Sequence, residues 1–148
     1  DAQASLERDE AVDLVALAAE EGSRIGADLQ ASGHVPAVHG DERLLRRALR
    51  NLLENARRYG GDDVMLELRA EGASVQARVC DRGPGVPESM RERIFEPFFR
   101  LPGHAEQAGG VGLGLSLVKQ IAERHGGSVR CEARESGGTC FVLALRAG

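Results

Sequence analysis

The stretch Gly109-Gly110-Val111-Gly112-Leu113-Gly114-Leu115-Ser116-Leu117-Val118 places alternating glycines directly before an apolar helical pattern. Glycine lets the backbone adopt positive φ and approach a ligand closely. A helix that begins on such glycines presents unpaired N–H groups and the positive end of its dipole, which favour an anion. The stretch is not G-x-G-x-x-G, because Leu115 stands where the last glycine belongs, and it lacks the G-K-[ST] of a Walker loop. By itself it is either a phosphate-binding loop or a flexible connection before a helix.

The composition of the chain is that of one ordinary globular domain. Its 148 residues are enough to bury a core, and a net charge of -4 argues against a general nucleic-acid binder. No apolar run approaches the length of a membrane span, and no signal-peptide pattern opens the chain. The three cysteines, Cys80, Cys131 and Cys140, show no C-x-x-C spacing. We predict that they are unpaired core residues in a reducing compartment.

A long helix is predicted from Asp41, a good N-cap, to Tyr59, before Gly60-Gly61. Its apolar residues form one broad arc that must face a core: Leu45, Ala48, Leu49, Leu52, Leu53 and Ala56. Asn51, Asn55 and Arg58 form a stripe along the shoulder of that arc. Asparagine is a poor residue in the middle of a helix. The two asparagines are therefore either helix-flanking amides or an oxygen-bearing ledge suited to a hard cation such as Mg²⁺.

The same helix is locally basic. Its arginines are Arg43, Arg46, Arg47, Arg50 and Arg57. A solvated face is the default interpretation, and a docking surface for an acidic partner is the alternative.

The remaining elements are shorter. We expect a helix over 12–19 ending at Gly22, a short strand over 25–29 and an extended piece over 35–38. Residues 64–69 and 74–80 alternate apolar and polar, which predicts an antiparallel hairpin with one wet face on each strand. Two closing strands are expected near 128–134 and 139–145.

Two segments between these elements carry candidate chemistry. Asp81 follows a predicted strand and precedes Gly83-Pro84-Gly85, which sets a carboxylate beside tightly bent backbone, although turn chemistry alone explains the pattern. Residues 94–99 hold three of the four phenylalanines. They are either a hydrophobic clasp that precedes a lid over 101–109, or core anchors of a plain surface loop.

Four short motifs occur in a fixed order along the chain. They are Asn51-x-x-x-Asn55-Ala56-Arg57-Arg58-Tyr59, Asp81-x-Gly83-x-Gly85, Phe95-x-Pro97-Phe98 and Gly110-x-Gly112-Leu113-Gly114-Leu115. Their order and spacing resemble the N, G1, F and G2 boxes of sensor histidine kinases, over roughly residues 41–145. The resemblance implies a Bergerat-type α/β (α+β) two-layer sandwich. In it, a mixed, mostly antiparallel sheet is covered on one face by three helices, and ATP lies between the helices and a lid.

For the adenine base, the resemblance implies that Asp81 accepts a hydrogen bond from the exocyclic amine. Gly83 and Gly85 would keep side chains out of the way of the base. Thr139, in Gly138-Thr139-x-Phe141, resembles a residue that supports the adenine-binding Asp81.

For the phosphates and the metal, Asn55 resembles the Mg²⁺ ligand, and Asn51 and Arg58 resemble phosphate-side partners. Asn51 and Asn55 are thus the expected catalytic residues, and Tyr59 resembles a pocket wall. The glycine motif would supply the lid hinge and phosphate-binding amides, through Gly110, Gly112, Leu113, Gly114 and Leu115. The implied cofactors are ATP and Mg²⁺.

Position 51 distinguishes this chain from related gyrase, mismatch-repair and chaperone ATPases, which resemble the fold but place a Glu there to activate water. The amide of Asn51 cannot be a general base. Glu54 points about 60° away from Asn51, toward the polar arc. We therefore expect a domain that holds ATP for transfer and hydrolyses it only slowly.

The family transfers its phosphoryl group to a histidine on a separate dimerising helix pair. None of the histidines here lies in such a context: His34, His39, His104 and His125. His39 and His125 are expected to be structural, with His125 a cation favoured by a helix dipole.

Residues 1–10 are accordingly expected to end a linker from an upstream dimerisation domain, and 11–148 to form the catalytic ATP-binding domain. The implied partners are that dimerisation domain, in a homodimeric kinase, and the receiver domain of a response regulator. We expect a monomer for this chain alone, a cytoplasmic location within an inner-membrane sensor, and no nucleic acid. An ATP-binding interaction module and an anti-sigma-type serine kinase stay open as alternatives.

Overall fold

The structure is a computed structural model that describes residues 6–99 and 114–148. Its helices and strands, in chain order, are β1 (Glu10–Val12), α1 (Leu14–Ser23), β2 (Asp28–Ser32), β3 (Val38–Gly40), α2 (Glu42–Gly60), β4 (Met65–Glu71), β5 (Ser74–Asp81), η1 (Glu88–Met90), η2 (Arg93–Phe95), α3 (Gly114–Arg124), β6 (Ser128–Ala133) and β7 (Thr139–Arg146). None of the described helices is both long and apolar enough to cross a bilayer.

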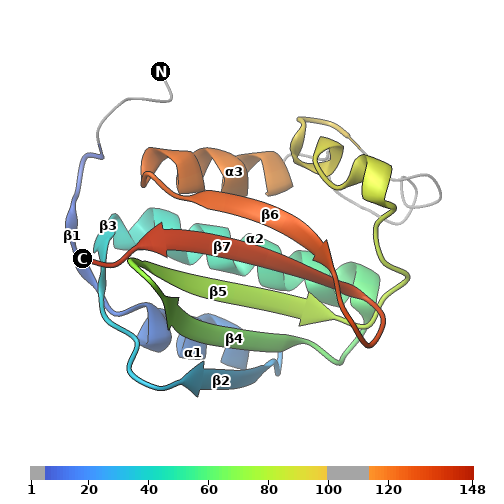
Figure 1. Cartoon of the computed structure of the whole chain (residues 1–148), viewed down its shortest axis with the longest axis horizontal. Coiled ribbons are helices and arrows are strands. Elements are labelled where there is room, and N and C mark those ends of the chain that lie inside the picture. Colours follow the sequence, from blue (N-terminus) through green and yellow to red (C-terminus); the bar gives the residue numbers. More distant parts are fainter. Residues whose placement is uncertain (1–5, 100–113) are drawn as a thin grey trace.

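The fold has two layers, as Figure 1 shows. The main sheet has five strands in the order β2-β4-β5-β7-β6. β2 runs parallel to β4, and the other neighbours are antiparallel. The α-helices described, α1, α2 and α3, lie together behind the sheet in this view. β1 pairs with β3 in a separate small ladder. The predicted mixed, mostly antiparallel sheet with helices on one face is confirmed.

Helix α2 forms where it was expected. The Asp41 carboxylate accepts from the N–H of Arg43 at 3.0 Å and of Leu44 at 3.3 Å, which satisfies two unpaired donors of the first turn. The helix ends before Gly61, which has a φ of 81°. The predicted apolar arc is buried against the sheet: Leu45, Ala48, Leu49, Leu52, Leu53 and Ala56. Burial of this face explains why a helix with so many arginines is stable.

Three predicted boundaries near the N-terminus are wrong. Asp13 caps α1 by accepting from the N–H of Ala16 at 3.1 Å, so the helix begins at Leu14, and Val12 belongs to β1. The helix also continues past Gly22, which packs near Leu66 of β4. The strand expected over 25–29 begins later, at Asp28, where pairing with β4 starts.

Strand β5 does not have the wet face that its alternating sequence predicted. It lies between β4 and β7, and Gln76 and Cys80 are buried although they point away from the helices. Arg78, on that same outer face, lies between Glu67 of β4 and Glu132 of β6 at 3.7 and 3.3 Å. A central strand keeps little solvent exposure because both neighbours and their long side chains cover it.

Four of the arginines of α2 divide into two groups. Arg43 and Arg47 are exposed, as a solvated face predicts. Arg46 and Arg50 instead bind Glu21 of α1, whose side chain is only 2% exposed, at 2.8 and 2.7 Å. For these two residues the interpretation as a solvated face is wrong, because their charges join α2 to α1.

His125 joins the end of α3 to the start of α2. Its Nε2 accepts from the backbone N–H of Asp41 at 3.0 Å, and its Nδ1 lies 2.7 Å from the carbonyl oxygen of Ile121. An accepting Nε2 carries no proton, so Nδ1 is the donor and the ring is neutral. The structural role predicted for His125 is confirmed, but the expected cation is wrong. Position 40 requires glycine, because a Cβ there would overlap the imidazole ring of His125.

Candidate functional site

Asp81 lies at the last residue of β5, and its side chain is 4% exposed. Its Oδ1 accepts from the N–H of Gly83 at 2.8 Å, and Thr139 of β7 is its Cα partner in the ladder. Burial raises the pKa of Asp81, and backbone hydrogen bonds from Gly83 and Thr139 and the charge of Arg134 oppose that rise. The structure therefore places a desolvated carboxylate at the end of the central strand, on the helix side of the sheet.

Glycines from three separate elements approach Asp81. A Cβ on Gly60, at the end of α2, would overlap the Asp81 side chain. A Cβ on Gly83 would lie 2.6 Å from the carbonyl oxygen of Tyr59, and one on Gly138 would overlap the carbonyl oxygen of Asp81. The predicted carboxylate beside tightly bent backbone is thus present, in the contact of Asp81 with Gly83. Sequence reasoning treated Gly60 and Gly138 only as a helix end and a turn, but Gly60 lies against the carboxylate of Asp81 and Gly138 lies against its backbone carbonyl.

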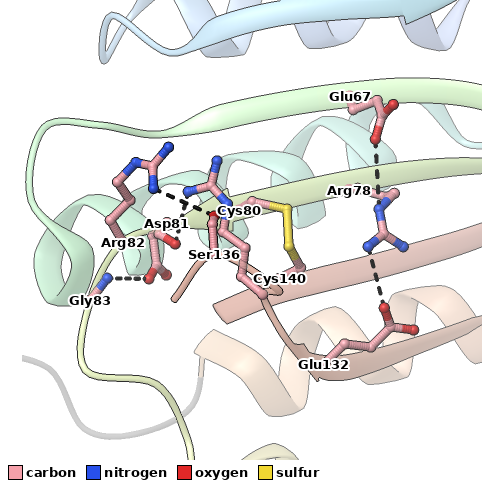
Figure 2. The surroundings of a disulfide bond; sticks show 10 residues. Glu67, Arg78, Cys80, Asp81, Arg82, Gly83, Glu132, Ser136 and Cys140 are labelled. Atoms are coloured by element: carbon pink, nitrogen blue, oxygen red, sulfur yellow. Dashed lines mark hydrogen bonds and ion pairs between the residues drawn. A yellow bond between two sulfur atoms is a disulfide. The ribbon is translucent and has the colours of Figure 1, made fainter. Parts of the chain in front are cut away.

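The turn between β6 and β7 also holds the backbone of Asp81. Arg134 donates from Nη1 to the carbonyl oxygen of Asp81 at 3.1 Å. Arg82, the next residue along the chain, binds Asp63 and Ser136. Figure 2 shows the contact of Arg82 with Ser136 and that of Gly83 with Asp81 at the end of β5. Sequence reasoning missed Arg134, and its only signal was a basic residue just before a Gly-Gly turn.

The polar stripe of α2 lies on the shoulder of the buried arc, as predicted. Asn51, Asn55 and Tyr59 are half-buried, and Arg58 is exposed. Among the described residues, no hydrogen bond or ion pair involves the side chain of Asn51 or Asn55. Two half-buried amides with no partner among residues 6–99 and 114–148 are what a ledge that receives a ligand requires. Glu54 is exposed, as its direction on the helix predicted.

Only part of the glycine motif can be located. Gly110, Gly112 and Leu113, and the lid predicted over 101–109, lie outside the described residues. Gly114 is the first residue of α3, and Leu115 is half-buried against the core. α3 starts beside η2, at the end of the molecule where β5 ends and β6 turns into β7 (Figure 1).

The phenylalanines of 94–99 do not all form one clasp. Phe95 is buried and meets Phe141 of β7 edge to face, with ring centroids 6.1 Å apart. Phe98 is 68% exposed and has a positive φ of 66°. Phe95 thus anchors the segment in the core, and the expectation of a common clasp is wrong for Phe98.

A metal would depend on few protein ligands here. Within residues 6–99 and 114–148, no group of three or more His, Cys, Asp or Glu is arranged to hold a metal ion. Mg²⁺ commonly takes one or two protein ligands and completes its shell with phosphate oxygens and water. The amide of Asn55, which has no partner in the part of the chain that the structure describes, fits that donor set because an amide oxygen is a hard ligand.

Cys80 and Cys140 form a disulfide, which overturns the prediction of three unpaired cysteines. They are direct partners in the β5–β7 ladder, one position before Asp81 and one after Thr139. Cys131 is unpaired and buried, as predicted. The odd number of cysteines and the absence of C-x-x-C hid the pair, because the pairing depends on which strands become neighbours.

A hollow of about 380 Å³ lies elsewhere, between β1, α1 and the start of α2. Its lining residues are Glu10, Ala11, Val12, Asp13, Ala16, Leu17, Glu20 and Glu42. None of the predicted site residues lines it.

Residues 40–148 match the family model described as histidine kinase-, DNA gyrase B- and HSP90-like ATPase. The chain is 40% identical over 114 residues to the adaptive-response sensory kinase SasA of Prochlorococcus marinus (strain MIT 9313), covering 75% of this chain and 31% of that protein. It is 42% identical over 133 residues to the sensor protein RstB of Escherichia coli (strain K12), covering 89% of this chain and 30% of that protein. The chain thus spans about a third of the length of the curated relatives that it matches.

Solved structures of histidine kinase domains have a similar fold. The catalytic domain of the histidine kinase ThkA superposes with a TM-score of 0.80 at 26% identity, covering 94% of this chain and 95% of that one. The ATP-binding domain of PrrB from Mycobacterium tuberculosis superposes with a TM-score of 0.75 at 32% identity, covering 96% and 99%.

Proposed function

Since this chain belongs to the family of histidine kinase-, DNA gyrase B- and HSP90-like ATPases, we propose that it is the ATP-binding catalytic domain of a sensor histidine kinase. In this proposal it binds Mg·ATP and transfers the γ-phosphoryl group to a histidine on a separate dimerisation domain. The observation that supports it most is the buried carboxylate of Asp81, which has glycines from α2 and from the turn after β5 against its side chain, and one from the turn before β7 against its carbonyl.

Asp81 would read the base. An ionised carboxylate only accepts hydrogen bonds, so it selects an amino group such as the exocyclic amine of adenine. Gly60 and Gly83 lie against this carboxylate with no side chain of their own, and Gly138 lies against the backbone carbonyl of the same residue. Thr139 would support Asp81 from β7, where it is buried. Gly85, with a φ of 86°, would continue the glycine wall along the base.

The shoulder of α2 would face the phosphates. Asn55 would hold Mg²⁺ through its amide oxygen, and the bound ion would neutralise the charge of the phosphate oxygens. Asn51, one turn earlier, and Arg58 would contact the phosphate side, and Tyr59 would form the pocket wall. Gly114 and Leu115 belong to the same site as the start of α3. Because Asn51 cannot remove a proton from water, the site would hold ATP for transfer rather than hydrolysis.

The whole protein's partners follow from this role. We propose that they are the dimerisation domain that carries the acceptor histidine, in a homodimeric kinase, and the receiver domain of a response regulator. Residues 1–10 would join that dimerisation domain to the catalytic domain of 11–148, and both would act in the cytoplasm.

Transfer of labelled phosphate tests the proposal. Phosphoryl transfer depends mainly on placing the acceptor in line with the γ-phosphate. This chain should therefore bind γ-labelled ATP, hydrolyse it slowly and fail to label itself. Addition of the separately produced dimerisation domain should give acid-labile, alkali-stable labelling of that partner. Acid-stable labelling of a partner would instead indicate a serine kinase. ATP binding with no transfer to any partner would indicate an interaction module.

A further inference from the structure

The Cys80–Cys140 disulfide holds together the strand ends that carry the nucleotide site. It joins β5 to β7 at one pair of the ladder, and the next pair, Asp81 with Thr139, is the last. Beyond Asp81 the chain leaves the sheet, and before Thr139 it makes the turn at Gly138. The terminal pairs of a ladder open most easily, because only one side of them is supported. A covalent link one position inside the end limits this opening.

The disulfide is behind the site and does not line it. Successive side chains of a strand point to opposite faces. Asp81 points toward α2, where Gly60 lies against it, so Cys80 points to the outer face, which none of the described helices covers. Figure 2 shows the disulfide on this face, beside Asp81 and near Arg78. Cys80 is 7% exposed and Cys140 is 3% exposed, so a reductant would reach the bond from this face, at Cys80.

The remaining cysteine is separated from this pair. Cys131 is part of the core cluster and is the ladder partner of Phe141, so it faces the helices. Burial also raises the pKa of the Cys131 thiol to about 11, so little of it is a nucleophilic thiolate. Exchange between Cys131 and the disulfide is therefore disfavoured by both position and chemistry, and Cys80 and Cys140 form an isolated redox couple.

We propose that this couple regulates the nucleotide site, with the disulfide form binding ATP tightly and the dithiol form binding it weakly. This inference rests on the function proposed above. The co-reactant is a dithiol. One of its thiolates attacks a sulfur of the disulfide, which gives a mixed disulfide and releases the other cysteine as a thiolate. The second thiol of the reductant then displaces the remaining cysteine. Two electrons and two protons have then passed to Cys80 and Cys140, and the reductant leaves as a disulfide.

Reduction of the disulfide lowers the affinity for ATP through the neighbouring pair, Asp81 and Thr139. Two unbonded sulfur atoms need more space than a bonded pair, so the strands lose a constraint at the pair next to Asp81. Arg134 still donates to the carbonyl oxygen of Asp81, so the site is weakened and not destroyed. If the terminal pair is closed in only about a tenth to a third of reduced molecules, the dissociation constant for ATP rises about three- to tenfold.

Calorimetric titration of the oxidised and the dithiothreitol-reduced chain with ATP tests this proposal, with thiol counts by mass spectrometry confirming each state. The wild type should lose about three- to tenfold in affinity on reduction. Cys131→Ala, the matched control, should lose the same amount. The Cys80→Ala/Cys140→Ala double variant should bind like the reduced wild type and should not respond to reductant.

Equal affinity of the oxidised and reduced wild type would overturn the proposal and leave ATP binding intact. The proposal would also be overturned if Cys80 and Cys140 could both still be alkylated after treatment with a small-molecule disulfide, because the bond between them would then not have formed. Absence of ATP binding in both redox states would overturn the proposed function as well. Because the central comparison uses the wild type, it does not depend on whether the double variant folds.

Discussion

Asp81 shows how a binding residue can oppose folding. Burial raises its pKa, because removal from water penalises the ionised form more than the neighbouring hydrogen bonds favour it. The folded chain therefore binds a proton at Asp81 more readily than the unfolded chain does. As pH rises from the ordinary range of an aspartate through this raised pKa, the folded state loses stability relative to the unfolded state. The ionised carboxylate is therefore a net cost to folding, which its hydrogen bonds and Arg134 offset only in part.

We predict that Asp81→Asn is more stable than the wild type at neutral pH but binds ATP more weakly. The amide oxygen of Asn can still accept from the N–H of Gly83, so the substitution removes the charge and keeps the turn. Chemical denaturation from acid to neutral pH should show that the free energy of unfolding of the variant exceeds that of the wild type by an amount that grows with pH and then levels off. A stability difference that does not change with pH would show that the charge of Asp81 is not the cause.

Asn55 should act through the metal. In Asn55→Ala, the affinity for ATP in EDTA should be nearly unchanged. The factor by which Mg²⁺ raises that affinity should fall about tenfold or more, as expected on loss or misorientation of a metal ligand. Glu54→Ala is the matched control, because Glu54 is the adjacent residue on α2 and is exposed. It should leave both affinities as they are. An equal loss for Asn55→Ala with and without metal would make Asn55 a phosphate contact or a structural residue.

At the scale of elements, one buried carboxylate fixes the contact between α1 and α2. Arg50 donates to Glu21 from Nε at 2.7 Å and from Nη2 at 3.1 Å, and Arg46 donates at 2.8 Å. The hydrogen bond from Arg50 lowers the pKa of Glu21 more than burial raises it, and Arg46 lowers it further. A carboxylate with a lowered pKa stabilises the fold above its ordinary pKa and loses that contribution as pH falls through the lowered value.

Glu21→Gln should therefore reduce the free energy of unfolding by about 1–3 kcal/mol at neutral pH, the scale of hydrogen bonds to a charged group. The difference from wild type should shrink as the pH falls into the acid range. Glu20→Gln is the control: Glu20 binds the same Arg46 at 2.7 Å but is 60% exposed. It should cost no more than about 0.5 kcal/mol. Equal losses of unfolding free energy in the two variants would show that burial of Glu21 does not strengthen its ion pairs.

The elements that the sequence predicted well are those with local signals. Asp41 caps α2 and the apolar arc of that helix is buried, because both features depend on residues within a few positions of each other. The start of α1 was wrong because the apolar pattern extends to Val12 although Asp13 is the cap. The wet face expected for β5 was wrong because its burial depends on β4 and β7, which no local pattern specifies.

At the scale of the whole molecule, the candidate site is assembled from distant parts of the chain. The carboxylate at the end of β5 was predictable from a strand followed by Gly-Pro-Gly. Its contact with Gly60 and its hydrogen bond from Arg134 were not, because they require α2 and the β6–β7 turn to meet at one end of the sheet. The same holds for the Cys80–Cys140 disulfide, which exists because β5 and β7 are neighbours in one particular register.

The central claim is that this meeting point reads adenine through Asp81, and calorimetry with ATP and GTP tests it most directly. GTP offers an acceptor at O6 where Asp81 needs a donor, so the wild type should bind ATP far more tightly than GTP. Asp81→Ala should lose about ten- to a hundredfold in ATP affinity, the value of a hydrogen bond to a charged group. Equal affinity of the wild type for ATP and GTP, or unchanged ATP affinity in a folded Asp81→Ala variant, would contradict the claim.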